Sequence, residues 1–577
     1  MPAILFTLLS LAPLAGAQEL DPSASPWGIS SSASSNRTAA DWFPKVSAAG
    51  VRWARLGPEW GGLERQPGQW SFDALDATLK TADQSHIRIS GILFGSPRWT
   101  NQPSHAFPMQ HLDAWSHYAA TLAGRYKGRI DRWEVWNEGN AAFNDNHNTT
   151  ADYASLVSAA YTGVKSANPQ AQVGMSVASF DAPYLRQAMI AQAKSGHPDQ
   201  FDYLCIHPYE VIEGVKDPFG EIPYLWMTRY LRDALQASAP NRRDADIWIT
   251  EIGAPVGKLW SADDSAKVAV KAYVMAIAQG IQRTMWFEGQ DPVGEQAGFG
   301  LLDKSGTPRP ALTAFKTMTT CLGPAPKPLG WLALGKDGKG YGFVFDGSTV
   351  PVLAAWMPAG ASDTITFPGS VQVINALTGA ATNLKANEAL TLTDTPLFIL
   401  DLPPDLTARA RASARKNYPW GGDYSQAQTV SIQFGLTTTE SGLFHRAEKS
   451  TRPHQFPDGS AGLEITNNRV GSFVVHPSFA SFTTTDYYIR LTLRRIAPGN
   501  VGMNFAYEVA DSQGKSPMHH TPGWYSLPEG LQWQSHTWHV TDACFSKMWG
   551  YDFAFLPEKT VPFVIGKVEV STKPFAN

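Results

Sequence analysis

The sequence predicts an α/β protein in which a (β/α)8 TIM barrel is followed by two all-β sandwich domains. Short apolar segments alternate with longer amphipathic segments through residues 26–322. Helical periodicity stops after the proline-rich run at residues 322–328, and a second strand-rich region begins near residue 410. The chain of 577 residues is also too long for one ordinary domain, so a division into several domains is expected.

Residues 26–322 contain eight candidate strands in β-then-α order, which is the number that a (β/α)8 barrel needs. The candidates are Trp27–Ser30, Val51–Leu56, Ile87–Phe94, Arg132–Asn137, Gln172–Ala178, Phe201–His207, Ile247–Ile252 and Arg283–Phe287. The helix-like segments between them include Leu112–Tyr126, Tyr153–Ala167, Ala182–Ala193 and Ser265–Gln279. A doubly wound open sheet is the alternative, but it usually has fewer strands and a glycine-rich first turn that this sequence lacks.

The remaining sequence predicts two β-domains. Residues 323–403 are expected to form a small β-sandwich, Leu402-Pro-Pro-Asp405 a linker, and residues 410–577 a jelly-roll-like sandwich. Tryptophans make this last domain a candidate for carbohydrate binding, although packing against the barrel would explain them equally well. These tryptophans are Trp420, Trp524, Trp533, Trp538 and Trp549.

Residues 1–17 resemble a signal peptide, because a short apolar stretch ends in the small residues Ala15-Gly16-Ala17. We therefore expect a secreted or periplasmic protein whose mature chain starts near Gln18. The net charge of -4 gives no basic surface for nucleic acid or an anionic membrane. The three cysteines are widely spaced, and no metal-ligand motif is apparent, so neither a metal nor a cofactor is expected. The oligomeric state stays open.

Two glutamates lie at the carboxyl ends of predicted barrel strands. Glu138, in the run that begins at Asp131, directly follows the fourth strand, and Glu251, in the run that begins at Asp246, lies at the end of the seventh. Active sites of this fold lie at the carboxyl ends of the strands, so the two side chains are expected to face each other. Cleavage of a glycosidic bond needs such a pair: one carboxyl protonates the leaving oxygen, and the other attacks the anomeric carbon or activates water.

The runs Trp-Glu-Val-Trp-Asn-Glu and Ile-Thr-Glu-Ile-Gly resemble clan A glycoside hydrolases, and most closely family 39 and its relatives. Residues 51–76, 95–99 and 201–209 are similar to further segments of that group, and the resemblance covers about residues 26–400. It implies that Glu138 is the general acid/base and Glu251 the nucleophile. It also implies a double displacement at β-glycosidic bonds that retains the anomeric configuration.

The same resemblance gives supporting roles to four other residues. Asn137 would hydrogen-bond the sugar 2-hydroxyl, a contact that strengthens in the transition state. Arg55, at the end of the second strand, would pair with Glu251 and keep it ionised, unless it pairs with a nearer glutamate. His207 and Tyr209 would hold the nucleophile or touch the sugar, although a histidine at a strand end can also be an ordinary core residue.

Further residues near the predicted barrel mouth are candidates for sugar contacts. Trp286 on the eighth strand would form the floor of the -1 subsite, with ordinary barrel packing as the alternative. Trp60 and Trp99 are candidates for neighbouring subsites. Glu288 would bind either a sugar hydroxyl or Arg55.

Glu134 is a second glutamate on the strand that leads to Glu138. At the usual strand rise it lies about 13 Å deeper in the barrel than Glu138. We therefore expect Glu134 to be a structural ion-pair partner, with Arg52 as its cation, and to take no part in the site.

Three functions fit these residues. The first is a secreted retaining hydrolase of a polysaccharide or oligosaccharide, whose substrate is a carbohydrate. The second is a non-catalytic glycan-binding protein on a barrel scaffold, which loss of either glutamate would favour, and neither is lost. The third is a transglycosidase, which differs only in whether water or a sugar accepts the intermediate. The loops that select the sugar and its linkage carry no readable signal.

Overall fold

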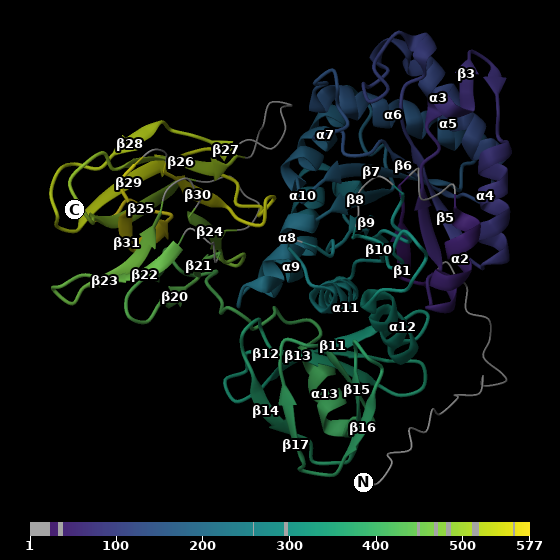
Figure 1. The fold of residues 1–577 in the computed structure, drawn as a ribbon. Coiled ribbons are helices and arrows are strands. Elements are labelled where there is room, and N and C mark those ends of the chain that lie inside the picture. The colour runs from purple at the N-terminus through teal and green to yellow at the C-terminus, as the bar shows by residue number, and fades with distance from the viewer. Residues whose placement is uncertain are drawn as a thin grey trace.

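The computed structural model describes residues 24–32, 38–257, 259–293, 298–446, 451–466, 471–480, 486–509, 519–557 and 560–576. The predicted signal peptide at residues 1–17 lies outside this range. Figure 1 shows a helix-ringed barrel, a small β-domain beneath it in this view, and a second β-domain at one side. Among the described helices, none combines the length and the apolar character needed to cross a bilayer.

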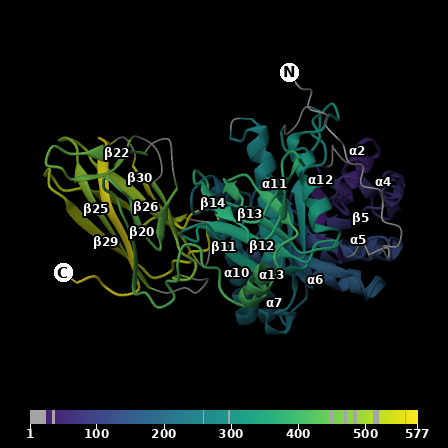
Figure 2. The ribbon, with the colours of Figure 1, turned by 90° about the horizontal axis from the view of Figure 1, so that it is seen from below.

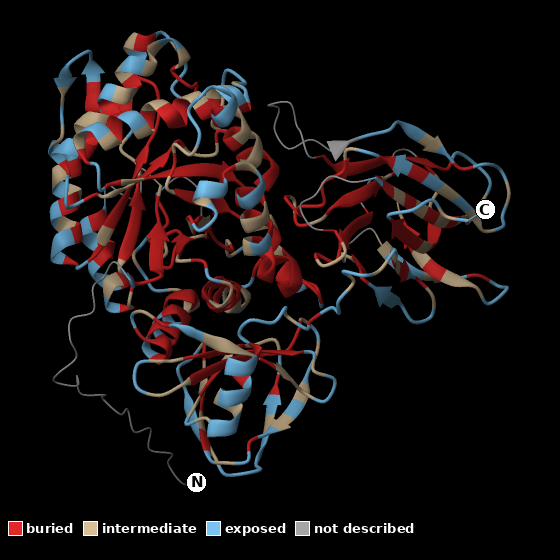
Figure 3. Cartoon of the chain, turned by 180° about the vertical axis from the view of Figure 1, so that it is seen from behind, coloured by how far each residue is buried: buried red, intermediate tan, exposed pale blue. Residues whose placement is uncertain are grey.

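Eight parallel strands close into the predicted barrel, and β10 pairs back with β1, where Thr284 lies opposite Trp27. They are β1 (Trp27–Ser30), β2 (Trp53–Leu56), β5 (Arg88–Leu93), β6 (Arg132–Val135), β7 (Gln172–Ala178), β8 (Tyr203–His207), β9 (Asp246–Ile252) and β10 (Arg283–Phe287). Figure 3 shows these strands buried along nearly their whole length. They are buried because helices cover the outside and side chains fill the inside.

Amphipathic helices surround the barrel where the sequence predicts them. The main ones are α2 (Ala39–Ala48), α4 (Asp73–Gln84), α5 (Leu112–Arg125), α6 (Thr150–Ala167), α7 (Ala182–Lys194), α10 (Met227–Ser238), α11 (Ala262–Ala278) and α12 (Pro310–Leu322). Helix α6 starts with a capping box, in which Thr149 and Asp152 each accept a hydrogen bond from the other's backbone N–H.

Short elements occupy the loops of the barrel. They are α3 (Trp60–Leu63), β3 (Glu64–Gln66), β4 (Gln69–Trp70), α8 (Tyr209–Glu213), α9 (Glu221–Leu225) and 3-10 turns at Arg98–Thr100, Met109–His111, Gly214–Lys216 and Pro240–Arg242. Helices α8 and α9 both lie in the connection between β8 and α10.

The middle β-domain contains a six-stranded sheet and a separate strand pair. The sheet is formed by β11 (Pro328–Leu334), β12 (Gly340–Phe345), β13 (Val352–Trp356), β18 (Leu397–Leu400), β15 (Val371–Asn375) and β16 (Ala381–Leu384), and the pair by β14 (Asp363–Thr366) and β17 (Ala389–Leu392).

The expected linker at residues 402–405 is corrected by helix α13 (Pro404–Ser413), which begins inside it. Proline at the first helical position suits a helix start, because its missing N–H would have no partner there. The helix packs on β11, where the Ser413 hydroxyl donates to the Trp331 carbonyl (2.6 Å) and accepts from the Trp331 N–H (2.9 Å). The middle domain therefore extends through Ser413.

The last domain is a sandwich of two antiparallel sheets around an apolar core that includes Phe473, Phe505 and Phe553. One sheet contains β19 (Thr429–Gln433), β20 (Thr439–Ser441), β22 (Thr451–Gln455), β23 (Ala461–Ile465), β25 (Tyr487–Arg495), β29 (Gln534–Val540) and β31 (Phe563–Ser571). The other contains β21 (Leu443–His445), β24 (Gly471–Val475), β26 (Gly502–Glu508), β27 (His519–His520), β28 (Trp524–Ser526) and β30 (Phe553–Leu556). Figure 2 shows the sandwich beside the other two parts.

The tryptophans predicted for sugar binding in this region have different environments. Trp420 is buried against Trp331 of the middle domain, and Trp538 is buried in the core of the sandwich. Trp524 is 44% exposed. Packing therefore accounts for Trp420 and Trp538.

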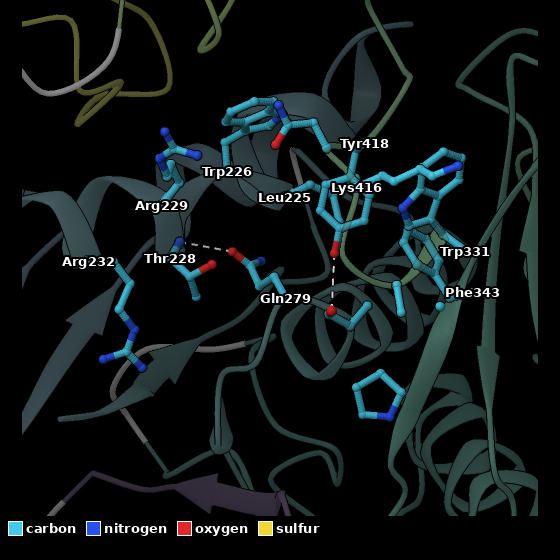
Figure 4. Close-up of a pocket in the computed structure, with 15 residues that line it drawn as sticks. Leu225, Trp226, Thr228, Arg229, Arg232, Gln279, Trp331, Phe343, Lys416 and Tyr418 are labelled. Carbon is cyan, nitrogen blue, oxygen red and sulfur yellow. Dashed lines mark hydrogen bonds between the residues drawn. The ribbon is translucent and has the colours of Figure 1, made fainter. Parts of the chain in front are cut away.

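The chain that leads into the sandwich closes a cavity of about 380 Å³ between the barrel and the middle domain. Figure 4 shows this junction, where the Tyr418 hydroxyl donates to the Ala278 carbonyl (3.1 Å). In the same view the Thr228 N–H donates to the side-chain oxygen of Gln279 (3.1 Å). Tyr418 thus holds the segment that follows α13 against the barrel.

Helices α5 and α6 pack so closely that Gly163 leaves no room for a side chain. A Cβ added at Gly163 would lie 2.1 Å from the Ser116 carbonyl oxygen, whereas one added at Gly124 would lie 3.5 Å from the Cβ of Ala167. We expect Gly163→Ala to lower the free energy of unfolding by about 1–3 kcal/mol. The control Gly124→Ala is expected to be neutral or to stabilise by up to about 1 kcal/mol. Denaturant unfolding measures both variants, and equal stabilities would contradict the packing.

Candidate active site

The carboxyl ends of the barrel strands open into a cavity of about 810 Å³. Polar and charged lining residues include Arg55, Asn137, Glu138, Tyr209 and Glu251, and aromatic ones include Phe94, Phe143, Trp260, Phe287 and Phe299. This is the end of the barrel at which enzymes of this fold place their active sites. The cavity also has the size of a site for a small ligand.

Glu138 and Glu251 face each other across this cavity. One oxygen of each carboxyl group and a ring nitrogen of His207 all lie within 4.8 Å of one another. The chain leaves β6 after Val135, and Glu138 has a φ of 48°, a left-handed conformation that residues other than glycine seldom adopt. Both glutamates are partly exposed, at 21% and 13% of the side chain, so a ligand in the cavity can reach them.

Arg55 connects the base of the site to Glu251. Its guanidinium is 2% exposed and donates to both Glu134 oxygens, at 2.7 and 2.9 Å. Nη1 contacts Glu251, and Nη2 donates to the side-chain oxygen of Asn137 (2.7 Å). The expected contact between Arg55 and Glu251 is present. The same guanidinium also fixes the orientation of the Asn137 amide.

Glu134 belongs to this network, which corrects the expectation that it pairs with Arg52 away from the site. The Arg52 guanidinium instead donates to backbone carbonyls, including that of Ser47 (3.0 Å). Burial would raise the pKa of Glu134, but the charge and hydrogen bonds of Arg55 lower it to about 2. The depth estimate fails because the chain turns after β6, which brings Glu134 and Glu138 to the same imidazole.

His207 is fully buried between the glutamates. Its Nδ1 lies 2.9 Å from a Glu138 oxygen, and its Nε2 lies 3.1 Å from the Thr250 hydroxyl. Burial would lower the pKa of His207, but the charge of Glu251, the Glu134 carboxylate 3.8 Å from Nε2 and the hydrogen bond to Glu138 raise it to about 9. Burial would also raise the pKa of Glu138, but His207 lowers it through its hydrogen bond and charge. The surrounding carboxylates therefore favour the protonated imidazole.

Tyr209 donates its hydroxyl hydrogen bond to the second Glu251 oxygen at 3.1 Å. Burial, together with the charges of Glu251 and Glu138, holds the pKa of the Tyr209 hydroxyl well above its usual range. The hydroxyl thus stays protonated and can stabilise a carboxylate. Glu251 is therefore held from two sides, by Arg55 and by Tyr209.

Trp286 does not line the cavity, which corrects its expected place on the floor of the sugar subsite. Its side chain is fully buried, and the indole N–H donates to the Phe299 carbonyl (3.1 Å). The next residue, Phe287, does line the cavity. Neighbouring residues of a strand face opposite sides, so a shift of one position moves the aromatic side chain from the core to the site.

Trp60 and Trp99 are also absent from the cavity lining; Trp60 follows β2, and Trp99 lies in the 3-10 turn that follows β5. The Trp60 indole is fully buried, stacks on Tyr118 with ring centroids 5.1 Å apart, and donates to the Glu64 carboxylate (2.6 Å). Trp99 packs edge-on against Trp60 and donates to the Glu64 carbonyl (3.1 Å). Both tryptophans are structural, contrary to the expectation.

Glu288 is fully buried and binds Ser32 rather than Arg55. One carboxyl oxygen accepts from the Ser32 N–H (3.2 Å) and from its hydroxyl (2.9 Å). Burial raises the pKa of Glu288 to about 7. Ser32 lines the cavity, so Glu288 supports the wall from behind.

Sequence reasoning missed several lining residues on loops. They include Glu59, His105, Glu210, Glu213, Leu259, Trp260 and Phe299. The amino group of Lys216 lies 3.7 Å above the Trp260 ring, which fixes that aromatic wall. Nothing in the local pattern marks these positions, because loops from separate parts of the chain meet only in the folded barrel.

Glu138, His207 and Glu251 are spaced closely enough to be considered as metal ligands. A metal-binding histidine must offer an unprotonated ring nitrogen. Both ring nitrogens of His207 instead lie at hydrogen-bond distance from protein groups, at 2.9 Å from Glu138 and 3.1 Å from Thr250. The arrangement fits two carboxyl groups that share a proton-donating imidazole.

Comparison with solved structures shows that the barrel has the fold of a family 39 glycoside hydrolase. A family 39 glycoside hydrolase from Bacteroides cellulosilyticus WH2 matches 66% of this chain and 82% of its own, with a TM-score of 0.56 and 18% identity. A family 39 β-xylosidase from Caulobacter crescentus matches 66% of this chain and 96% of its own, with a TM-score of 0.49 and 17% identity.

Sequence comparison gives a more distant relation. No protein-family model matches the chain. Endo-1,4-β-xylanase 3 of Hypocrea jecorina is 27% identical over 133 residues, which cover 21% of this chain. The chain thus spans only 37% of the length of that xylanase.

The charge on His207 should make folding stability depend on pH. Its folded pKa of about 9 lies above the ordinary 6.5, so its stabilising effect is complete below pH 6.5 and is lost as pH rises through 9. Over that window we expect the free energy of unfolding to fall by at most about 1.4 kcal/mol per pH unit. Denaturant unfolding at several pH values measures this slope. In His207→Gln this pH dependence of the free energy of unfolding should disappear. Identical slopes in the variant and the wild-type protein would refute the role of His207.

Proposed function

We propose that this protein is a retaining glycoside hydrolase that cleaves β-glycosidic bonds of a polysaccharide or oligosaccharide. The observation that carries the proposal is the approach of the Glu138 and Glu251 oxygens to within 4.8 Å. Retaining enzymes hold their carboxyl groups about 5–5.5 Å apart, whereas inverting enzymes need about 6.5–9.5 Å to admit a water. The family 39-like barrel supports the same proposal.

In the first step Glu251 attacks the anomeric carbon while Glu138 protonates the departing oxygen. Arg55 and Tyr209 hold one Glu251 oxygen each, which aims the carboxylate and stabilises its charge. The proton comes from the Glu138–His207 pair, whose atoms lie 2.9 Å apart. Once a bound sugar excludes water from the cavity, the neutral carboxyl form of Glu138 is favoured, because burial disfavours its ionised form.

In the second step Glu138 acts as a base, takes a proton from water, and the resulting hydroxide releases the sugar from Glu251. The proton from water thus replaces the one that the Glu138–His207 pair gave to the leaving group, and the 2.9 Å contact lets the pair share it again. Asn137, whose side-chain oxygen is held by Arg55, is oriented to meet the sugar 2-hydroxyl with its amide N–H.

Xylose-based β-glycans are the first substrates that we propose to test. The support is the partial sequence match to an endo-1,4-β-xylanase and the similarity in fold to a family 39 enzyme. Aromatic side chains such as Phe287 and Trp260 provide apolar surfaces for sugar rings within the cavity. Because the Ala15-Gly16-Ala17 segment has the pattern of a cleavage site, we propose that the enzyme acts after export.

Two variants test the assigned roles with paired substrates. Glu138→Gln removes the acid, so an alkyl or sugar leaving group should react about 10²–10⁴ times more slowly. A dinitrophenyl leaving group needs no proton, so formation of the glycosyl-enzyme from it should be nearly unchanged. Glu251→Gln removes the nucleophile and should abolish turnover of both substrates. Steady-state and burst kinetics measure these rates, and equal losses for both leaving groups in Glu138→Gln would contradict the acid role.

The stereochemistry of the product gives an independent test. Direct attack by Glu251 predicts that a β-glycoside yields first the β-sugar, because two inversions restore the configuration. Proton NMR of the first turnovers distinguishes the anomers before they equilibrate. Initial release of the α-sugar would refute the nucleophile role of Glu251.

A further inference from the structure

The segment between β8 and α10 supplies three residues of the active-site cavity, Tyr209, Glu210 and Glu213. Tyr209, the first residue of α8, donates to Glu251, and Glu213 is the last residue of the helix. The helix has only five residues and cannot be stable by itself. Its position must therefore be fixed by the structures that pack against it.

The C-terminal sandwich packs against this segment. Figure 1 shows β21 and β24 as the sandwich strands nearest to α8 and α9. Phe444 of β21 stacks on Phe219, with ring centroids 4.9 Å apart and a 15° angle between the rings. Arg446, just after β21, pairs with Asp217 at 3.4 Å, and both side chains are largely buried.

A third contact reaches α8 itself. Gly550 of the sandwich lies so close to the helix that an added Cβ would be 2.4 Å from the Glu210 carbonyl oxygen. Gly550 has a φ of 74°, which glycine adopts readily. Glu210 directly follows Tyr209 in the chain, so the sandwich backbone touches the residue next to the one that holds the nucleophile.

The interface is anchored by a buried charge. Lys547 of the sandwich, 1% exposed, donates to the Tyr230 hydroxyl of α10 (2.8 Å) and pairs with Asp552 (3.2 Å). The Tyr230 hydroxyl donates in turn to the Ala480 carbonyl (3.2 Å). A lysine can be buried in this way only where its partners stay in place, so the docking is a fixed part of the fold.

We propose that the C-terminal sandwich is a positioning part of the catalytic site and not an independently tethered module. Through Gly550, Arg446 and Phe444 it sets the position of α8, and α8 sets the hydrogen bond from Tyr209 to Glu251. This inference rests on the proposed hydrolase function, because the positioned bond is the one that stabilises the nucleophile.

A pair of glycine variants tests the proposal in the full-length protein. Gly550→Ala places a methyl group against the Glu210 carbonyl and should displace α8. Gly459→Ala is the matched control, because Gly459 has a similar φ of 85° in the same domain and its added Cβ would have nothing within 4 Å. The probe is an aryl β-xyloside, or whichever aryl β-glycoside the wild-type protein hydrolyses best.

For Gly550→Ala we expect kcat to fall by about tenfold to a hundredfold, since small misplacements of catalytic groups are costly. The acidic limb of the kcat/KM profile should move up by about 0.5–1 pH unit, because a weaker Tyr209 hydrogen bond stabilises the ionised nucleophile less. The control should keep wild-type kcat and pH profile. A structural role alone would lower the melting temperature without moving the acidic limb.

Arg446 gives a second test that adds no bulk. Arg446→Ala should shift the acidic limb in the same direction, and Arg446→Lys should restore it in part by keeping a cation beside Asp217. Arg452→Ala, which removes a pair with Glu464 inside the sandwich, should have no effect on the limb. Wild-type kcat and limb in both Gly550→Ala and Arg446→Ala would overturn the proposal. Turnover that persists in Glu251→Gln would instead overturn the nucleophile role of Glu251, and a wild-type protein that hydrolyses no aryl β-glycoside would overturn the hydrolase function itself.

Discussion

A single buried guanidinium holds the active site together. Arg55 bridges the Glu134 carboxylate of β6, the Asn137 amide and the Glu251 carboxylate. A buried arginine is tolerated only when carboxylates compensate its charge, and each carboxylate here would be costly without the arginine. The planar guanidinium also fixes the directions of its hydrogen bonds. Arg55 therefore both balances the charge of the nucleophile Glu251 and orients it.

The charges around Arg55 explain how the site serves its chemistry. Glu134, Glu138 and Glu251 bring three carboxyl groups to one place, and Arg55 and His207 bring two cations. With all three acids ionised and His207 protonated, the network is negative by one charge. Positive charge develops on the sugar ring in the transition state of glycoside cleavage, and a preorganised negative site stabilises it.

The two β-domains contact the barrel near the active site. The middle domain reaches the barrel through Trp356, whose indole donates to Glu221 of α9 (3.1 Å), and Glu221 also pairs with Lys271 (2.8 Å). The C-terminal sandwich reaches the same connection through Phe444 and Arg446. Both β-domains thus pack against the connection between β8 and α10, which contains Tyr209.

The sequence by itself determined the barrel, the two β-domains and the pair Glu138 and Glu251. Hydrophobic period and strand-end position are local properties, so they can be read without coordinates. The tertiary structure decided what lies beside the pair. In the structure Phe287 rather than Trp286 lines the cavity, and Trp60 and Trp99 do not line it. Glu134 pairs with Arg55. These outcomes depend on which face a strand residue presents and on where separate loops meet, and long-range packing alone fixes both.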